Sequence, residues 1–149
     1  MYIASYGWDH AAWSGSFYPD DLPPEWRLAF YANEFRAVVV PAAVWRGADA
    51  VLAGQWMEDT GKGFRFFLEP NADRAAPPPA MLEVLGERCG GVLGDGGMMV
   101  ARWEGGADAR ALRGLLEGLP ADGLLAIAGE PPSLEALRAA QTLAQLMGV

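Results

Sequence analysis

The sequence contains one cysteine, Cys89, and one histidine, His10, among its 149 residues. A single thiol cannot form an internal disulfide, and Cys89 lacks the Cys and His neighbours that a zinc site requires. This scarcity excludes a disulfide framework and a zinc-binding motif. We therefore expect no metal site and interpret Cys89 as a small buried thiol.

Long apolar runs and basic residues are also scarce. No segment approaches the roughly 20 apolar residues of a membrane-spanning helix, and the N-terminal residues lack the basic-then-apolar order of a signal peptide. There are 19 acidic and 11 basic residues, for a net charge of −8, whereas nucleic-acid binding needs a basic face. We expect a bacterial-type cytoplasmic protein with neither a membrane nor a nucleic-acid partner.

The chain alternates between segments typical of strands and segments typical of helices. Apolar residues make up 52% of the sequence and charged residues 20%, which fits one globular domain over residues 1–149. Such alternation implies a mostly parallel sheet with right-handed crossovers, built from about five β/α units. The expected strands cover residues 1–5, 36–45, 64–69, 98–103 and 123–129. Pro41 is expected to end the ladder pairing of the second strand or to lie at its exit. The expected helices cover residues 25–35, directly after Pro23 and Pro24, and residues 49–60, 80–88, 108–119 and 133–147, with Asp108 and Ser133 as N-caps.

The glycine-rich stretch CGGVLGDGG at residues 89–97 suggests a phosphate-binding loop at first sight. It lacks the G-x-x-x-x-G-K-[ST] pattern, and no G-x-G-x-x-G lies between the first strand and the first helix. We interpret the stretch as a flexible turn and expect no cofactor.

Six tryptophans are many for this length. Trp26 and Trp56 fall within expected helices and are predicted to lie in the core. The other four are at loops or strand ends, where they either line a shared pocket that stacks a sugar ring or a base, or form an aromatic lid: Trp8, Trp13, Trp45 and Trp103.

His10 lies beside Asp9 in the aromatic stretch GWDHAAWSGSFYP, residues 7–19. A histidine oriented by a carboxylate is a possible general base, but no serine or cysteine occurs in the sequence context of a nucleophile. A structural role, a ligand contact and a catalytic base all remain open for His10, and the structural role is favoured.

The same stretch carries a resemblance. The residues concerned are Gly7-Trp8, Trp13-Ser14-Gly15-Ser16-Phe17-Tyr18-Pro19, Leu22-Pro23, Tyr31-Ala32, Phe35 and Val38, followed later by Gly63–Phe66 and Pro132-Ser133. In this order they resemble the YecE-like family, also called the domain-of-unknown-function 72 family. The resemblance implies a TIM-barrel-like fold and no firmly established activity.

The chain departs from the family pattern at six polar positions. Where the family typically has Glu, Asn, Lys, Glu, Arg and His, this sequence has Val39, Pro41, Glu69, Ala128, Glu130 and Pro131. These positions lie at the C-terminal ends of the expected strands, where barrel enzymes keep their active sites. The resemblance therefore implies that the family's polar pocket has been lost here.

Length also separates this chain from a closed barrel, since eight β/α units need about 250 residues. We expect an incomplete TIM-barrel-like parallel sheet, with an open doubly wound three-layer sheet as the alternative. Either form has two sheet edges that need covering, which predicts a homo-oligomer, most simply a dimer.

The sequence is compatible with two functions. The first is a non-catalytic, self-associating or partner-binding degenerate family member, with an apolar, filled interior at the strand ends. The alternative is a binding protein or hydrolase for a small molecule, such as a sugar or phosphosugar-like ligand, with a rewritten pocket. Its candidate contacts are Trp8, Asp9, His10, Trp13, Tyr18, Arg46, Glu69 and Glu130. Convergence of Glu69 and Glu130 on His10 around one cleft would favour this alternative.

Overall fold

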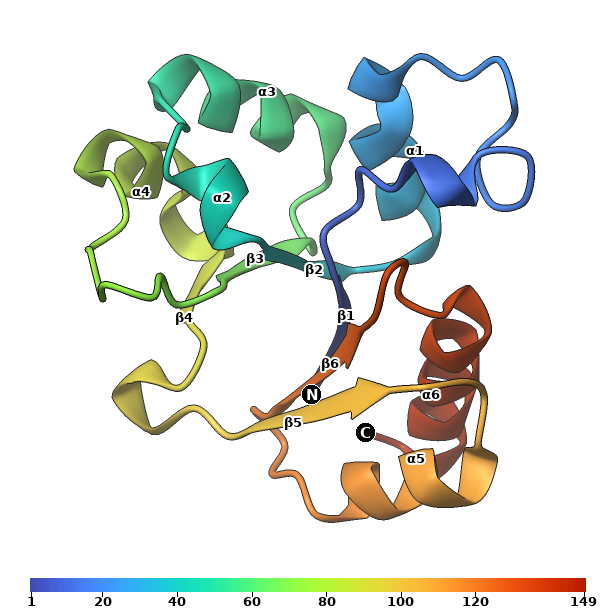
Figure 1. The fold of residues 1–149 in the computed structure, drawn as a ribbon. Coiled ribbons are helices and arrows are strands. Elements are labelled where there is room, and N and C mark those ends of the chain that lie inside the picture. The colour runs from blue at the N-terminus through green and yellow to red at the C-terminus, as the bar shows by residue number, and fades with distance from the viewer.

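A single six-stranded parallel sheet runs through the protein, with the strand order β4-β3-β2-β1-β6-β5 (Figure 1). The computed structural model describes all 149 residues. The strands are β1 (Tyr2–Tyr6), β2 (Ala37–Val40), β3 (Arg65–Leu68), β4 (Cys89–Val92), β5 (Val100–Glu104) and β6 (Leu124–Ala128). The α-helices are α1 (Arg27–Glu34), α2 (Ala42–Trp45), α3 (Ala50–Asp59), α4 (Pro79–Leu85), α5 (Ala109–Glu117) and α6 (Leu134–Met147).

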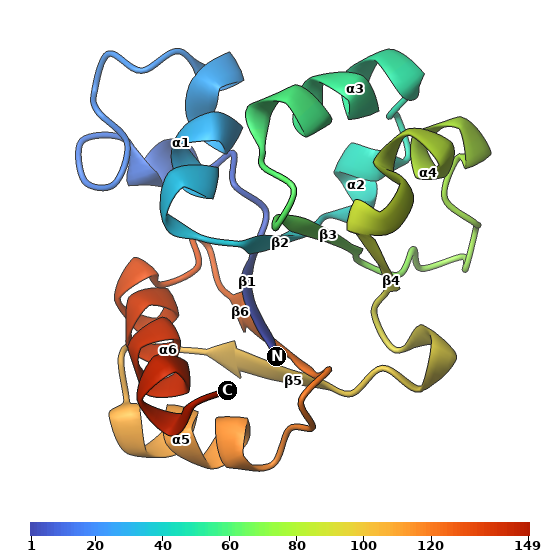
Figure 2. The same ribbon diagram turned by 180° about the vertical axis from the view of Figure 1, so that it is seen from behind.

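All six helices cover the same face of the sheet. They share one apolar cluster with the strand residues that point outward, such as Val38, Phe66 and Ile127. The alternate strand residues form a separate inner cluster that contains no helix residue. Figures 1 and 2 show the helices arranged around the outside of the curved sheet. A doubly wound sheet carries helices on both faces, so this fold is an open, TIM-barrel-like one.

The strand order is that of a barrel with a gap. In a closed barrel each strand lies beside its successor and the last strand pairs with the first. Here the last strand, β6, does pair with β1, and β5 lies beside β6. The opening falls between β4 and β5, where the link Leu93–Met99 joins the two edge strands without an α-helix (Figure 2). Leu93 and Met98 of this link pack on the inner cluster.

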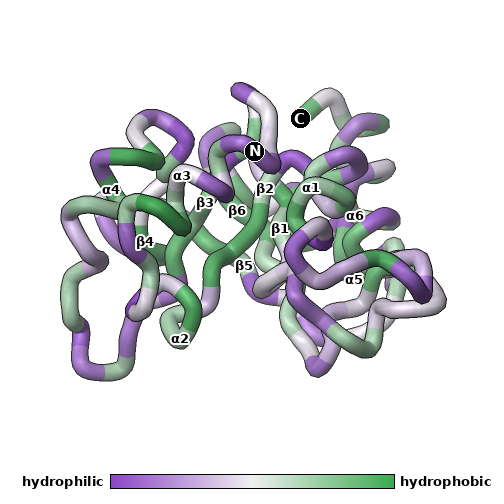
Figure 3. The backbone as a smooth tube through the Cα atoms, turned by 90° about the horizontal axis from the view of Figure 1, so that it is seen from above, coloured by the Kyte–Doolittle hydropathy of each residue, from purple (hydrophilic) through white to green (hydrophobic).

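Local sequence explains most element boundaries. Three helices begin at a side chain that accepts a backbone N–H, which is the ordinary N-cap arrangement. Asp49 accepts from Leu52 at 2.8 Å, Asp108 from Ala111 at 3.1 Å, and Ser133 from Ala136 at 3.0 Å. The caps predicted at Asp108 and Ser133 are confirmed. Figure 3 shows the apolar strands in the middle of the molecule, with hydrophilic segments around them.

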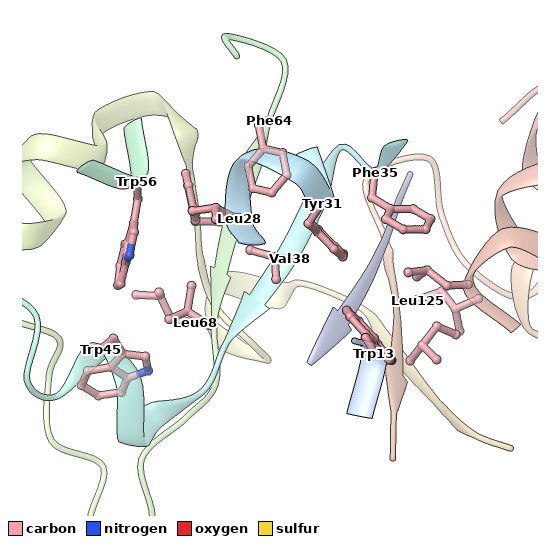
Figure 4. Close-up of a cluster of buried hydrophobic side chains, with 14 of the residues drawn as sticks. Trp13, Leu28, Tyr31, Phe35, Val38, Trp45, Trp56, Phe64, Leu68 and Leu125 are labelled. Carbon is pink, nitrogen blue, oxygen red and sulfur yellow. The ribbon is translucent and has the colours of Figure 1, made fainter. Parts of the chain in front are cut away.

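The outer cluster is rich in aromatic rings (Figure 4). Trp13 stacks on Tyr31 with ring centroids 6.4 Å apart. Tyr31 is fully buried; its hydroxyl donates to the Ala37 carbonyl at 2.6 Å and accepts from the Ser5 N–H at 3.3 Å. Burial raises the pKa of Tyr31 to about 12. Most aromatic residues of the 7–19 stretch therefore belong to the packing that joins the first strand to the first helix.

The glycine-rich stretch was expected to be a turn, and that expectation is wrong for its first half. Cys89–Val92 is a strand, so the sheet has six strands rather than five. The glycines hide this from propensity reasoning, because glycine is depleted in strands. Packing requires Gly90, since a Cβ there would lie 2.3 Å from Cε1 of Phe67. Cys89 is only partly buried, and burial raises the pKa of its thiol.

Two smaller expectations also need correction. Strand pairing ends at Val40, directly before Pro41, as predicted, but the rest of the segment expected over residues 36–45 forms the short helix α2. Trp56 is buried as predicted, at 4% exposure, but Trp26 is 61% exposed. Trp26 lies in a 3-10 turn that precedes α1, so it is not on the face of that helix that meets the sheet.

Candidate functional site

The candidate positions implied by the resemblance lie at the C-terminal ends of the strands. On the inner face, Val39 and Ala128 near these ends are buried, and so are Ala4 and Ala126 in the middle of their strands, all at 4% exposure or less. Val39 and Ala128 stand at two of the positions where the resemblance would place a glutamate. An apolar floor thus lies at the centre of this end of the sheet.

A polar hollow of about 340 Å³ lies beside this floor. Its charged and aromatic lining consists of Tyr6, Glu69, Arg102, Glu104 and Glu130. The guanidinium of Arg102 lies 5.5 Å from the centre of the Tyr6 ring, and its Nη2 is 3.5 Å from Oε2 of Glu104. Both charged side chains are more than 60% exposed. Burial raises the pKa of Tyr6, Arg102 acts in the opposite direction, and Glu69 adds to the rise.

Glu69 is held by the helix that follows the neighbouring strand. Its Oε1 accepts the backbone N–H of Ala42, the first residue of α2, at 3.0 Å. Its backbone carbonyl accepts the indole N–H of Trp45 at 2.9 Å. The carboxylate thus satisfies a free N–H at the beginning of α2, which is a structural role.

His10 lines a second hollow of about 420 Å³ together with Asp9, Ala11, Ala12 and Gly129–Pro131. Its Nε2 is 2.8 Å from the Tyr6 carbonyl, which assigns the proton to Nε2 and leaves Nδ1 as an acceptor. Burial lowers the pKa of His10, and its hydrogen bond to the Tyr6 backbone acts in the opposite direction. The ring packs on Trp13, with centroids 4.5 Å apart.

Only Glu130 among the candidate residues lines both hollows. It shares the first with Glu69 and the second with His10, whereas Glu69 does not line the hollow of His10. The two carboxylates therefore do not converge with His10 on one cleft. They do not lie on separate sides of the molecule either, since the two hollows adjoin at Glu130.

Asp9 does not orient His10 through a direct bond. Its carboxylate forms an ion pair with Arg27 at 2.5 Å, and Asp9 is 64% exposed. Arg27 also donates to Oγ of Ser14 at 3.4 Å and lies over the Tyr18 ring. Asp9 thus ties the aromatic stretch to the beginning of α1.

The remaining candidates line neither hollow. Tyr18 is 1% exposed and donates its hydroxyl to the Trp8 carbonyl, and burial raises its pKa. Trp13 is 2% exposed and donates its indole N–H to the Pro132 carbonyl at 3.2 Å. Trp8 packs edge-on against Trp56. Arg46 is exposed beyond α2.

The four tryptophans expected at loops and strand ends do not share a pocket. Trp13 and Trp45 are core residues, and Trp8 packs against the core. Trp103 donates its indole N–H to the Gly106 carbonyl at 3.0 Å, within its own turn. Their arrangement is closer to the expected aromatic lid over the core than to a binding pocket.

Sequence reasoning missed Tyr6, Arg102 and Glu104. The signal for the last two is the alternation along β5, in which Arg102 and Glu104 share one face while Ala101 and Trp103 share the other. That alternation places the charges on one side of a strand. It cannot place them beside Tyr6, because β5 and β1 are not neighbours in the chain and meet only through β6.

No group of three or more His, Cys, Asp or Glu side chains is arranged to hold a metal ion. None of the helices has the length and apolar character needed to cross a membrane. The fold and the site define an open, parallel α/β barrel whose strand ends carry a buried apolar floor and an exposed polar rim.

The comparisons with known proteins name the family. The model of the family described as "Protein of unknown function DUF72" matches residues 2–73, and through this N-terminal half the chain belongs to the DUF72 family. A crystal structure of a DUF72 family protein from Thermotoga maritima is similar over 99% of this chain, with 16% sequence identity and a TM-score of 0.46. The chain spans 62% of that protein. No curated protein matches the sequence.

Proposed function

We propose that this chain is a non-catalytic DUF72 protein that acts by self-association. The observation that carries the proposal is the state of the polar groups at the strand ends. His10 is bonded to the Tyr6 carbonyl, Glu69 to the Ala42 N–H, and Asp9 to Arg27. The floor between them is apolar. A general acid or base must reach a substrate proton, and each of these three side chains uses one polar atom to bind the protein itself. Nδ1 of His10 and the carboxylate of Glu130 are left without a protein partner.

The open side of the barrel supports the self-association. Both β4 and β5 present unpaired backbone groups to solvent, a feature that favours pairing with another chain. Leu93 donates its N–H to the Leu68 carbonyl of β3 at 2.9 Å. In a parallel ladder the N–H groups of successive residues point to opposite sides of the strand, so the N–H of Val92 points away from β3. β4 carries no charged residue, whereas β5 carries Arg102 and Glu104, and charges protect an edge. We assign the contact to β4.

In a twofold dimer the two β4 strands would pair antiparallel across the axis. Light scattering coupled to size exclusion should give twice the chain mass over a dilution series. Val92→Pro removes the outward N–H without touching the bond between β4 and β3, and should give a monomer. Arg102→Pro, which places the same change on the outer side of β5, should leave the dimer intact. A wild-type monomer at every concentration refutes the proposal, and circular dichroism checks that each variant is folded.

A second candidate function rests on Glu130, which joins the two hollows at the strand ends. Arg102, Tyr6 and Glu130 present the donors, acceptors and aromatic face with which a sugar or phosphosugar is bound. A thermal-shift screen with sugars and sugar phosphates tests this function. Ligand-dependent shifts that disappear in both Arg102→Ala and His10→Ala would support it, and the absence of any shift would exclude it.

A further inference from the structure

A third hollow, of about 760 Å³, lies at the C-terminal ends of β3 and β4. It shares no lining residue with the two hollows described above, and none of the eight candidate contacts of the small-molecule alternative lines it. Its walls come from Trp45, from the loop after β3 and from the beginning of the link that crosses the barrel opening. The residues that line it include Pro70, Asn71, Arg74, Pro77, Val92 and Asp95.

The loop after β3 holds itself in one conformation. Asn71 is 9% exposed, and its Nδ2 donates to Oδ1 of Asp73 at 2.7 Å. The same Asp73 oxygen accepts the Ala75 N–H at 2.8 Å, and the Arg74 N–H donates to the Asn71 carbonyl at 2.9 Å. These bonds make the loop wall of the hollow a pre-formed surface.

Arg74 is the only residue other than glycine with a positive φ, at 58°. A side chain in this left-handed region is uncommon and costs free energy that glycine would not. Arg74 is exposed and forms no ion pair within the protein. Its guanidinium is therefore a free cation at the edge of the hollow.

Asp95 supplies the opposite charge from the link. Asp95 is exposed, forms no ion pair, and its carboxylate accepts no hydrogen bond from the protein. The same hollow has apolar lining residues with accessible side chains. Pro70 is exposed, and Pro77 and Val92 are half-buried. Trp45 and Leu93 lie beneath them in the core, at 1% and 8% exposure.

We propose that this hollow binds a small zwitterion with an apolar body, the chemistry of a free apolar amino acid. The ligand's carboxylate pairs with the planar fork of Arg74, its ammonium pairs with Asp95, and its side chain lies against Pro70, Pro77 and Val92. A ligand with one charge alone would meet a like charge, from Asp95 if it were an anion and from Arg74 if it were a cation. The volume lies within the usual range of small-molecule pockets.

Titration calorimetry with L-leucine and L-phenylalanine tests this site on the full chain. Leucinamide lacks the carboxylate and N-acetyl-leucine lacks the ammonium, and each should bind at least about tenfold more weakly than leucine, because each leaves one charge of the site unpaired. Equal binding of either derivative refutes recognition of a zwitterion. The absence of heat with every amino acid refutes the site itself.

Two variants locate the ligand. Arg74→Gly removes the guanidinium, so binding should fall at least about tenfold. Because glycine adopts a positive φ freely, the unliganded variant should melt at the same temperature as the wild type or at a higher one. Asp95→Asn should weaken leucine binding to a similar degree. Glu104→Gln, in the separate hollow, is the matched control and should bind like the wild type. Undiminished binding in Arg74→Gly and Asp95→Asn places any amino-acid site elsewhere and overturns the proposal.

Discussion

Replacing Gly90 by alanine tests why β4 is built from glycines. The added Cβ would lie 2.3, 2.7 and 2.8 Å from three ring carbons of Phe67, distances that no packed carbon pair tolerates. Phe67 is 5% exposed and its ring packs against Tyr2 with centroids 5.5 Å apart. The phenyl ring must therefore move, and the inner cluster with it.

The magnitude follows from two opposed effects. Overpacking a core costs about 1–3 kcal/mol, while alanine at an unstrained glycine position stabilises by about 0.4–1 kcal/mol through the unfolded chain. We expect Gly90→Ala to lower the free energy of unfolding by about 1–2 kcal/mol, measured by urea denaturation followed by tryptophan fluorescence.

Gly114→Ala is the matched control. Gly114 lies inside α5, and a Cβ added there would meet nothing within 4 Å, so the same substitution should raise stability by about 0.5–1 kcal/mol. Phe67→Leu should relieve part of the loss in the Gly90→Ala background, because the two residues are in contact and their effects are not additive. A Gly90→Ala protein as stable as the wild type would refute this account of β4.

Three further predictions concern the aromatic stretch and the last helix. Tyr31→Phe should cost about 1–2 kcal/mol in denaturation experiments, because it leaves the buried carbonyl of Ala37 without its donor; an unchanged midpoint would contradict this. Ser133→Ala should cost about 1 kcal/mol through the lost cap of α6, and Ser133→Asp should restore it. Since burial lowers the pKa of His10 in the folded state, its contribution to stability is present above the unfolded value of about 6.5 and is lost as pH falls below it. Melting temperatures between pH 5 and 8 should show this loss in the wild type but not in His10→Gln.

The self-association and the amino-acid site use different parts of the open side. The proposed dimer contact lies along the outer edge of β4, and the amino-acid site lies at the end of that strand, between Arg74 and Asp95. Val92 lines the hollow as well, so a dimer through β4 would bring the ligand close to the interface. Comparing the oligomeric state with and without leucine would reveal any coupling between the two.

Local patterns in the sequence determined much of the fold. The caps at Asp108 and Ser133, the buried strand Ala37–Val40 and the alternation of strands with helices all follow from interactions between residues close in the chain. The resemblance through the stretch at residues 7–19 led to the family, because its aromatic residues pack on elements near them in sequence.

Only the tertiary structure decided the strand order, the edge position of β4 and the composition of the hollows. From the sequence, Gly90 indicates a turn, whereas in the structure it lies in a strand against the ring of Phe67. From the sequence, Arg102 is an isolated surface charge, whereas in the structure β6 places β5 close enough to β1 for Arg102 to lie over the Tyr6 ring. Arg74 and Asp95 face one hollow although they come from separate connections between strands. These contacts join residues far apart in the chain. Strand order and register determine which residues meet, and no local sequence pattern encodes strand order or register.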